Sequence, residues 1–199
     1  AIFPRTFVDL NRSHLELDPY LISGDFSFDK TARNMAGLGV IPRVSGNGKQ
    51  IYSKTIIAQD ALKRLERYYF PYHRFLTYLL LESKKRLGYA VLFDCHSMPS
   101  KLNLETNDSK KFNNTDIILG DLNGTSCSPI LTDKVKSIFE NYNFFVTKNH
   151  PFSGGYITKK YGNPSNAIHV IQIEINKKLY MDENCIKKNN NFENFRMKL

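Results

Sequence analysis

Cysteine is scarce in this sequence, and its pattern excludes two kinds of structural site. The three cysteines lie far apart and no two of them form a CxxC pair: Cys95, Cys127 and Cys185. An odd number of scattered cysteines predicts neither a disulfide framework nor a cysteine zinc site. We therefore expect a reducing, cytoplasmic setting.

Long apolar runs and a signal-peptide pattern are also lacking. The longest apolar stretch, around Leu76 to Leu81, is far too short to span a bilayer. The first residues contain Arg5 and Asp9 in place of an apolar signal core. The sequence accordingly predicts a soluble protein with no membrane partner.

The sequence also lacks the close histidine spacing of metalloprotease motifs. His14, His73, His150 and His169 fit no HExxH-type pattern. His169 and Glu174 differ by five positions, an odd number, so on a regular strand their side chains point to opposite faces. We expect His169 to be structural or to support a neighbouring group.

The composition is basic, and it also contains enough apolar residues for a core. Its 199 residues are 41% hydrophobic and 13% aromatic, enough for one domain with a sizeable core. With 28 Lys and Arg against 19 Asp and Glu, the formal net charge is +9. Such a charge attracts nucleic acid, anionic lipid or small anionic substrates and does not choose among them.

The N-terminal part is punctuated by turn formers. Residues 1–57 are rich in Gly and Pro between short apolar runs, which indicates loops and short strands. Between Gln59 and Arg86, apolar residues recur at helical spacing, interrupted by Pro71. This stretch predicts one kinked helix or two abutting helices.

The C-terminal part alternates strand-like and helix-like segments. Short apolar runs rich in strand formers are expected to be strands at residues 89–94, 116–121, 144–149 and 167–176. Thr132 is placed to cap a helix over residues 133–142. This alternation is typical of an α/β fold with a mixed, largely parallel central sheet flanked by helices.

One domain is expected to span residues 1–186. Residues 187–199, dominated by Lys and Asn, predict a polar tail with a short helix near Phe192 to Met197. In α/β sheets of this kind, ligands bind outside the carboxyl ends of the strands. Polar residues at strand ends are therefore the main functional candidates.

The sharpest candidate is His96, which follows the first predicted strand in the run Asp94-Cys95-His96-Ser97-Met98-Pro99. A neutral imidazole there can bind a divalent metal, and Asp94 could orient it if the backbone turns. The alternative is a core histidine bonded to a backbone carbonyl. The nearby carboxylate and the predicted strand end favour the functional interpretation.

Glu174 is the second candidate, because it lies inside an otherwise apolar strand. An ionised carboxylate is costly to bury there unless it is paired or bound to a metal, and a base of this kind suits water activation. The alternative is an outward-facing charge on a half-exposed strand, since Gln172, Glu174 and Asn176 alternate with isoleucines.

Two further groups are candidates for substrate binding. Arg5, Asn11 and Arg12, in PRTFVDLNR, suit an anionic acyl substrate, because a guanidinium binds a carboxylate through two hydrogen bonds and polarises a carbonyl. Gly154 and Gly155 permit close approach of a loop to a ligand. This loop also contains Tyr156, which can offer a phenol hydroxyl, although such loops also occur as simple connectors.

Several motifs taken together resemble one known family. In chain order they are PRTFVDLNR, ELDP, AGLGVIPRV, DCHSMPS, the GD and SC pair, NHPFSGGY, YGNP and QIEINKKLYMDE. In order and spacing, from about Pro4 to Glu183, they are similar to the N-formylglutamate amidohydrolase family.

That resemblance implies a fold related to zinc carboxypeptidases and aspartoacylase, with one divalent metal, zinc or cobalt. It implies that His96 is a metal ligand and that Glu174 is the general base. It further implies that Arg5 polarises the carbonyl while Asn11 and Arg12 grip the substrate carboxylate. The glycine loop, with Tyr156, is expected to close over the substrate.

The resemblance also leads us to expect a missing N-terminal portion. In the resembled family the first two metal ligands, a His and an acidic residue, precede the PRxxVDxNR stretch, and this chain begins with Ala1 close to that stretch. Alternatively, the missing strand comes from elsewhere, or the chain is a degenerate relative without activity. The spacing of His14 and Asp18 gives no support for substitute ligands.

The implied reaction is hydrolysis of N-formyl-L-glutamate to formate and L-glutamate, in histidine degradation. One alternative is an amidohydrolase for a different N-acyl amino acid. Another is a non-catalytic basic relative that binds nucleic acid or other polyanions, which the charge and the Lys/Asn-rich tail would suit. The enzyme is preferred because His96, Glu174 and both arginines occur together. Oligomeric state is left open.

Overall fold

The computed structural model describes residues 3–101 and 114–199. The chain divides into two units, Ala1–Glu82 and Ser83–Leu199. Within the described ranges, no helix combines the length and apolar character needed to cross a membrane.

The first unit is built from loops, short strands and the start of a long helical run, as its turn-rich sequence predicts. Its elements are β1 (Ile22–Ser23), α1 (Ala32–Met35), β2 (Ile56–Ile57), α2 (Ala58–Arg64), a π-helical turn (Leu65–Tyr69) and α3 (Phe70–Leu87), which continues into the second unit. β1 and β2 pair in parallel. Ala61, Leu65 and Tyr69, each four residues apart, are buried along one side of the helical run.

The long helical run is irregular just before Pro71. It is continuous in secondary structure, but the turn Leu65–Tyr69 has π-helical bonding and α3 begins at Phe70. Pro71, the second residue of α3, cannot donate a helical hydrogen bond to this preceding turn. The wider π-helical bonding is the local adjustment that accommodates the proline.

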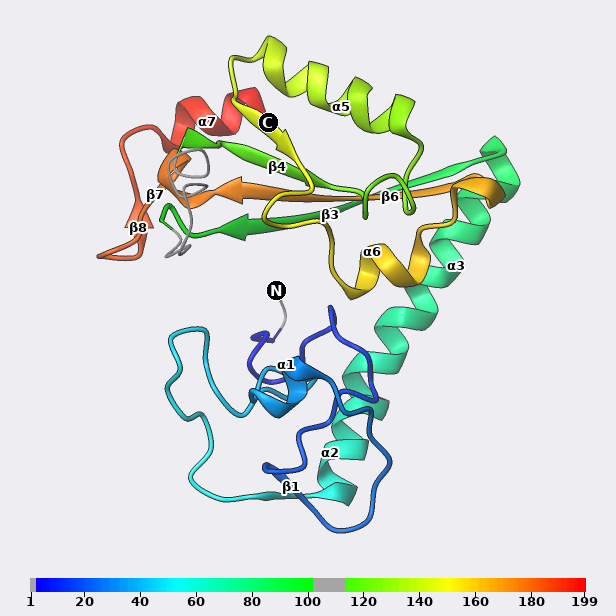
Figure 1. The fold of residues 1–199 in the computed structure, drawn as a ribbon, viewed down its shortest axis with the longest axis vertical. Helices are drawn as coiled ribbons and strands as arrows, with labels where there is room; N and C mark the ends of the chain where they lie inside the picture. Colours follow the sequence, from blue (N-terminus) through cyan, green and yellow to red (C-terminus); the bar gives the residue numbers. More distant parts are fainter. Residues whose placement is uncertain (1–2, 102–113) are drawn as a thin grey trace. The chain divides into compact units, whose positions relative to one another are not determined.

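The second unit contains a mixed four-stranded sheet with helices on both faces (Figure 1). Its strands and helices are β3 (Ala90–Met98), β4 (Ile117–Gly120), α5 (Pro129–Asn141), β5 (Val146–Lys148), α6 (Tyr156–Tyr161), β6 (Ile168–Asn176), β7 (Met181–Asp182), β8 (Lys187–Lys188) and α7 (Phe192–Lys198). The strand order is β3-β6-β4-β5. β3 pairs with β6 and β4 with β5 in parallel, whereas β4 and β6 are antiparallel. The predicted mixed, largely parallel sheet is confirmed.

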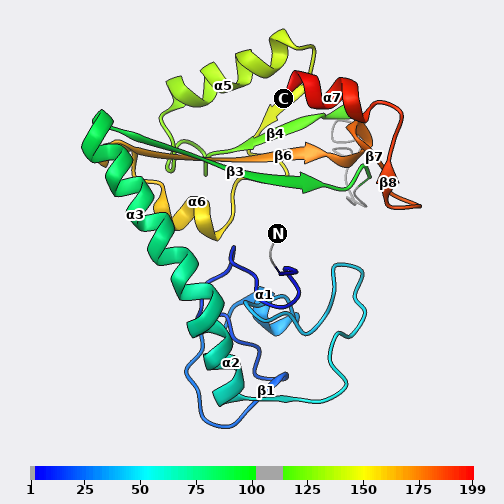
Figure 2. The same ribbon diagram turned by 180° about the vertical axis from the view of Figure 1, so that it is seen from behind.

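The two faces of this sheet differ in chemistry. Figures 1 and 2 both place α5 and α7 on one face and α6 on the other. Under α5 and α7 lies the apolar core, formed by Ile117, Leu119, Cys127, Val135, Phe144, Val146, Ile171, Ile173 and Phe195. Since strand residues alternate between faces, the polar residues between these isoleucines and leucines lie on the α6 side. That side carries the candidate site.

Two local predictions need correction. The first predicted strand was expected to end at Asp94, but β3 continues to Met98 because each of its residues pairs with β6. The helix expected over residues 133–142 begins earlier, at Pro129, with Ser128 at its N-cap. Proline is well suited to a first helical position, so Thr132 is an interior helix residue and not the cap.

The predicted tail is folded onto the second unit. Its expected short helix is present as α7, and Phe195 of that helix is only 6% exposed within the apolar core. The ring of Phe195 lies 5.9 Å from that of Phe144 and stacks on Tyr180. The predicted tail therefore shares the core of the second unit.

Candidate active site

The polar face of the sheet brings two predicted site residues opposite each other. In the parallel pair β3–β6, Asp94 is in register with Gln172, and His96 with Glu174. Residues in register on neighbouring strands share a face. Four polar side chains thus form a two-by-two arrangement on the side of the sheet away from the α5 core.

His96 and Asp94 contact each other on a regular strand. His96 Nε2 lies 3.0 Å from Asp94 Oδ1, and both side chains are largely buried. The expectation that the backbone must turn for this contact was wrong, because residues two apart on a strand lie on the same face. The carboxylate therefore fixes the orientation of the imidazole within the strand.

Glu174 is a buried carboxylate with an amide donor beside it. Its exposed fraction is 8%, so the alternative of an outward-facing charge on a half-exposed strand does not describe it. Gln172 Nε2 donates a 2.8 Å hydrogen bond to Glu174 Oε1. Burial and this bond together make Glu174 an oriented carboxylate of the kind that a general base requires.

A complete metal site is not found among the residues that the structure describes. No group of three or more His, Cys, Asp and Glu side chains in residues 3–101 and 114–199 is arranged to hold a metal ion. A catalytic zinc takes three protein ligands, whereas His96 and Asp94 form a pair. Of the substitute ligands considered, Asp18 is instead paired with Arg43 at 2.7 Å.

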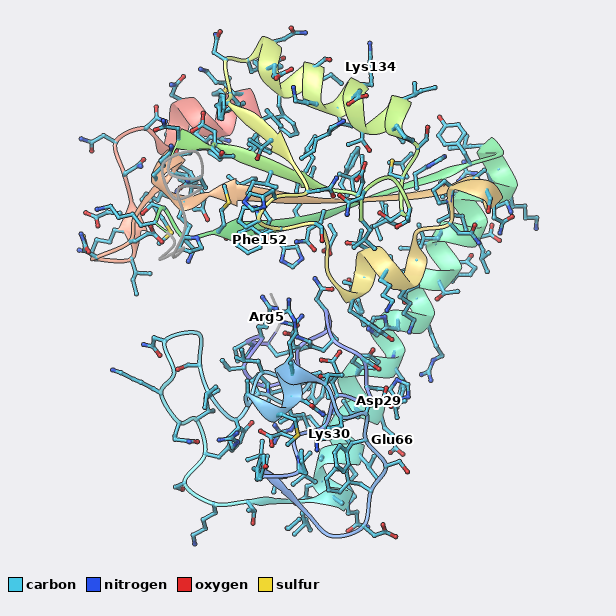
Figure 3. All side chains as sticks on the ribbon, viewed as in Figure 1. Arg5, Asp29, Lys30, Glu66, Lys134 and Phe152 are labelled. Carbon is cyan, nitrogen blue, oxygen red and sulfur yellow. The ribbon has the colours of Figure 1, made fainter. Side chains whose placement is uncertain are left out.

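The predicted substrate loop lies on the same face as Glu174. An added Cβ at Gly120 would come within 2.7 Å of the Ser153 backbone and 2.9 Å of Gly154 N. Gly120 is in register with Gln172, so this Cβ direction is the polar face. Phe152, labelled in Figure 3, lies on that face and packs against Met98 and Ile118.

Glycine is required where the loop passes into α6. Gly154 has φ +138, and a side chain there would crowd Leu122 and Thr158. The Gly155 N–H donates to Thr158 Oγ1 at 3.3 Å, and α6 then begins at Tyr156. The Lys160 ammonium lies 5.3 Å from the centre of the Tyr156 ring. Gly154, Gly155 and Tyr156 thus join His96 and Glu174 in the second unit.

The remaining predicted residues belong to the first unit and surround one buried carboxylate. Asp9 is 5% exposed, and its Oδ2 accepts a 2.8 Å hydrogen bond from Arg5 Nε. Its Oδ1 accepts one from the Asn11 N–H at 3.0 Å, and Arg12 Nε is 3.8 Å from Oδ2. Arg5, Asn11 and Arg12 are therefore brought together, with Asp9 as their common partner.

The two arginines of this cluster have different environments. The Arg5 side chain is 57% exposed, whereas that of Arg12 is 11% exposed and donates to the backbone carbonyls of Leu38 and Asn11. Burial lowers the pKa of the Arg12 guanidinium, although the neighbouring Asp9 carboxylate opposes this shift. Arg5 is the more accessible cation, and Arg12 is held by the fold.

Sequence reasoning missed two residues of these arrangements: Asp9 and Gln172. Gln172 could have been found, because it lies two residues before Glu174 and so shares its face on a strand. Asp9 gave no signal beyond its place among the arginines. His169, predicted to be structural, accepts a hydrogen bond from the Ser128 N–H at 3.2 Å.

Comparisons with known proteins agree on one family. The family model described as N-formylglutamate amidohydrolase matches residues 1–181. N-formylglutamate deformylase of Pseudomonas aeruginosa is 31% identical over 189 residues, covering 92% of this chain and 64% of that protein. The enzyme of the same name from Pseudomonas putida is 30% identical, with 92% and 63% covered. The chain spans a little less than two thirds of the length of these two relatives.

One solved structure supports the same assignment, and a second shares the fold. The crystal structure of N-formylglutamate amidohydrolase from Ralstonia eutropha JMP134 superposes with a TM-score of 0.87 at 28% identity, covering all of this chain and 71% of that one. A gene product from Agrobacterium tumefaciens, 16% identical with a TM-score of 0.63, shares the fold. On the match over residues 1–181, the chain belongs to the N-formylglutamate amidohydrolase family.

Proposed function

We propose that the protein hydrolyses the amide bond of an N-acyl acidic amino acid, with N-formyl-L-glutamate as the first substrate to test. The observation that carries this proposal is Glu174, a buried carboxylate oriented by Gln172 and in register with His96. The names of the Pseudomonas relatives and of the Ralstonia enzyme support the choice of substrate.

Glu174 is proposed as the general base. It accepts a proton from the water whose oxygen attacks the formyl carbon, and it returns that proton to the amide nitrogen as the carbon–nitrogen bond breaks. The products are formate and the free amino acid. An oriented carboxylate favours this shuttle because donor and acceptor atoms are already in place before the reaction begins.

The first-unit cluster is proposed to bind substrate. The exposed Arg5 guanidinium is suited to polarising the carbonyl oxygen and to sharing the negative charge that develops on it. Asn11 and Arg12 are proposed to bind the substrate carboxylate, since a guanidinium and an amide are good carboxylate donors. Gly154, Gly155 and Tyr156 are proposed as substrate contacts on the family resemblance.

The divalent metal, zinc or cobalt, remains a prediction from the family resemblance, as does the relation to zinc carboxypeptidases and aspartoacylase. The described residues supply no three-ligand set, so no step of the proposed reaction is assigned to a metal. Equilibrium dialysis with Zn²⁺ tests whether the protein takes up one equivalent and whether His96→Ala loses it. A cytoplasmic location and a place in histidine breakdown likewise rest on the resemblance alone.

The decisive experiment measures formate release from N-formyl-L-glutamate by the protein and by Glu174→Gln. We expect the substitution to abolish turnover, because glutamine cannot accept the proton. Glu140→Gln, on the surface helix α5, is the matched control and should leave turnover unchanged. Full activity of Glu174→Gln would remove Glu174 from the mechanism. Activity on other N-acyl amino acids alone would change the substrate and retain the reaction class.

A further inference from the structure

We infer that Gln172 is a positioning residue for Glu174: its side-chain amide holds the carboxylate in the orientation that proton transfer requires. This inference rests on the proposed role of Glu174 as the base. The names of the relatives say nothing of Gln172. The inference rests on the contact between the two side chains, on their surroundings and on the hydrogen bonds of the Gln172 amide.

The contact between the two residues is buried and direct. Gln172 is 5% exposed and Glu174 is 8% exposed, and the amide N–H donates to the carboxylate at 2.8 Å. They lie two residues apart on β6, so both side chains point to the same face. A hydrogen bond to a charged acceptor shielded from water is among the stronger kinds in proteins.

The surroundings restrict the amide. Gln172 is in register with Asp94 on β3 and with Gly120 on β4. The loop backbone at Ser153 and Gly154 packs over Gly120, where no side chain intervenes. Gln172 therefore lies in the interior of the polar face, where its side chain has little freedom to turn away from Glu174.

The other end of the amide indicates what the residue does. Gln172 Oε1 is buried and has no hydrogen-bond partner among the residues that the structure describes. Burying an acceptor in this way destabilises a fold, and an apolar side chain would avoid the cost. Exchanging the positions of Oε1 and Nε2 would not help. Oε1 would then face the carboxylate oxygen of Glu174, and Nε2 would take the place where Oε1 now has no partner. The benefit of Gln172 thus lies in the donor it offers to Glu174.

The contact can be observed without any assay of activity. The chain has three glutamines, and Gln50 and Gln59 are exposed. Labelling glutamine with ¹⁵N gives one side-chain amide pair for each, and Gln172→Met identifies the pair of Gln172. We expect one of its amide protons to resonate downfield of the other two pairs and to move back in Glu174→Met, which removes the acceptor and adds no amide. An amide pair that does not respond to Glu174→Met would overturn the inference.

Kinetics then separate positioning from a purely structural role. Gln172→Met keeps the length of the side chain and removes the donor. We expect kcat for N-formyl-L-glutamate to fall by about 10- to 100-fold, the loss of one hydrogen bond to a charged group. KM should stay within about two-fold, because the interaction with Glu174 acts on the chemical step and not on substrate binding.

Thr147→Val is the matched control. Thr147 is in register with Ile118, which is in register with Glu174, and its Oγ1 is also buried without a partner in the described part of the chain. Removing that hydroxyl alters the same face of the sheet without touching the base, so kcat should be unchanged. An equal loss of kcat in both variants would show a general effect on the sheet and overturn the inference.

The remaining outcomes separate this inference from the proposed function. If the parent protein is active and Gln172→Met retains full kcat, positioning by Gln172 is wrong and the hydrolase assignment stands. If only KM rises, Gln172 binds substrate and the inference is again wrong. If the parent protein releases no formate although the amide contact is seen by NMR, the proposed function is wrong. The inference is then wrong as well, because it depends on Glu174 acting as the base.

Discussion

Asn149 Nδ2 donates a 2.7 Å hydrogen bond to Asp121 Oδ1, joining the chain just after β5 to the chain just after β4. Asn149 Oδ1 in turn accepts from the Asp121 N–H at 3.0 Å. The backbone of Asn149 has φ +60, a conformation that asparagine tolerates better than most residues. This reciprocal pair fixes the start of the loop that carries Gly154 and Gly155.

Substitution of Asp121 by alanine should strongly destabilise the second unit. The buried Asp121 carboxylate also accepts from Thr132 Oγ1 at 2.8 Å and from the Gly124 N–H at 2.9 Å. Removing it leaves several donors unsatisfied, so we expect about 3 kcal/mol loss in the free energy of unfolding, measured by urea denaturation. Asp133→Ala, which breaks an exposed pair with Lys148, should cost less than about 1 kcal/mol. Equal losses would contradict the structural role of Asp121.

Gly120→Ala should displace the loop that is proposed to contact substrate. The new methyl group would lie 2.7 Å from Ser153 C, against backbone that cannot move aside like a flexible side chain. We expect about 1–3 kcal/mol loss of stability and a reduced kcat/KM for N-formyl-L-glutamate. Gly46→Ala is the control, because no atom lies within 4 Å of the position that its methyl group would take. An unchanged kcat/KM in Gly120→Ala would show that the loop position does not affect the reaction.

Asp9→Asn should weaken substrate binding. The Asp9 carboxylate pairs with Arg12 and accepts from the Asn11 N–H, the two residues proposed to bind the substrate carboxylate, and a neutral amide holds them less well. We expect KM for N-formyl-L-glutamate to rise about ten-fold, the loss of roughly one charge-assisted hydrogen bond. Asp25→Asn, at an exposed position of the same unit, serves as the comparison. A normal KM in Asp9→Asn would separate the Asp9 cluster from the substrate.

Acid should weaken the contact between Glu183, just after β7, and Ser100, just after β3. Burial alone raises the pKa of the Glu183 carboxyl, but hydrogen bonds from Ser100 and the charge of Lys177 outweigh it and lower that pKa below 4.5. A lowered carboxyl pKa stabilises the fold above about pH 4.5, and this stabilisation is lost as the pH falls through the folded-state pKa. Glu183→Gln should therefore be less stable than the parent protein at pH 7, with the difference closing towards pH 3. A difference that persists in acid would exclude ionisation as its cause.

The strands could be predicted from local patterns, and the length of β3 could not. Each apolar run expected to be a strand is one, because β-branched and aromatic residues favour strands wherever a sheet buries them. The polar residues Asp94, His96 and Ser97 suggested an early end to β3. Pairing with β6 extends that strand to Met98, and pairing between distant segments is not visible in local sequence.

The site shows the same division. His96 and Glu174 could be selected because each was a polar residue in an apolar context, and the structure places them in register. The residues that support the candidate site, Asp9 and Gln172, could not be selected from the sequence in this way. Asp9 looks in sequence like any carboxylate near arginines, and its importance depends on burial, which comes from tertiary packing. Gln172 required the strand register to reveal its donor contact.

The alternation of residues along β6 ties correct folding to chemistry. Gln172 and Glu174 lie on one face of that strand, while Ile171 and Ile173 lie in the core on the other. A slip of one residue in the pairing of β6 would turn the carboxylate into the apolar core and expose the isoleucines. Such a slipped chain would lose both its core and its proposed base in a single error. A chain that forms a stable sheet has therefore already placed Glu174 where it can act.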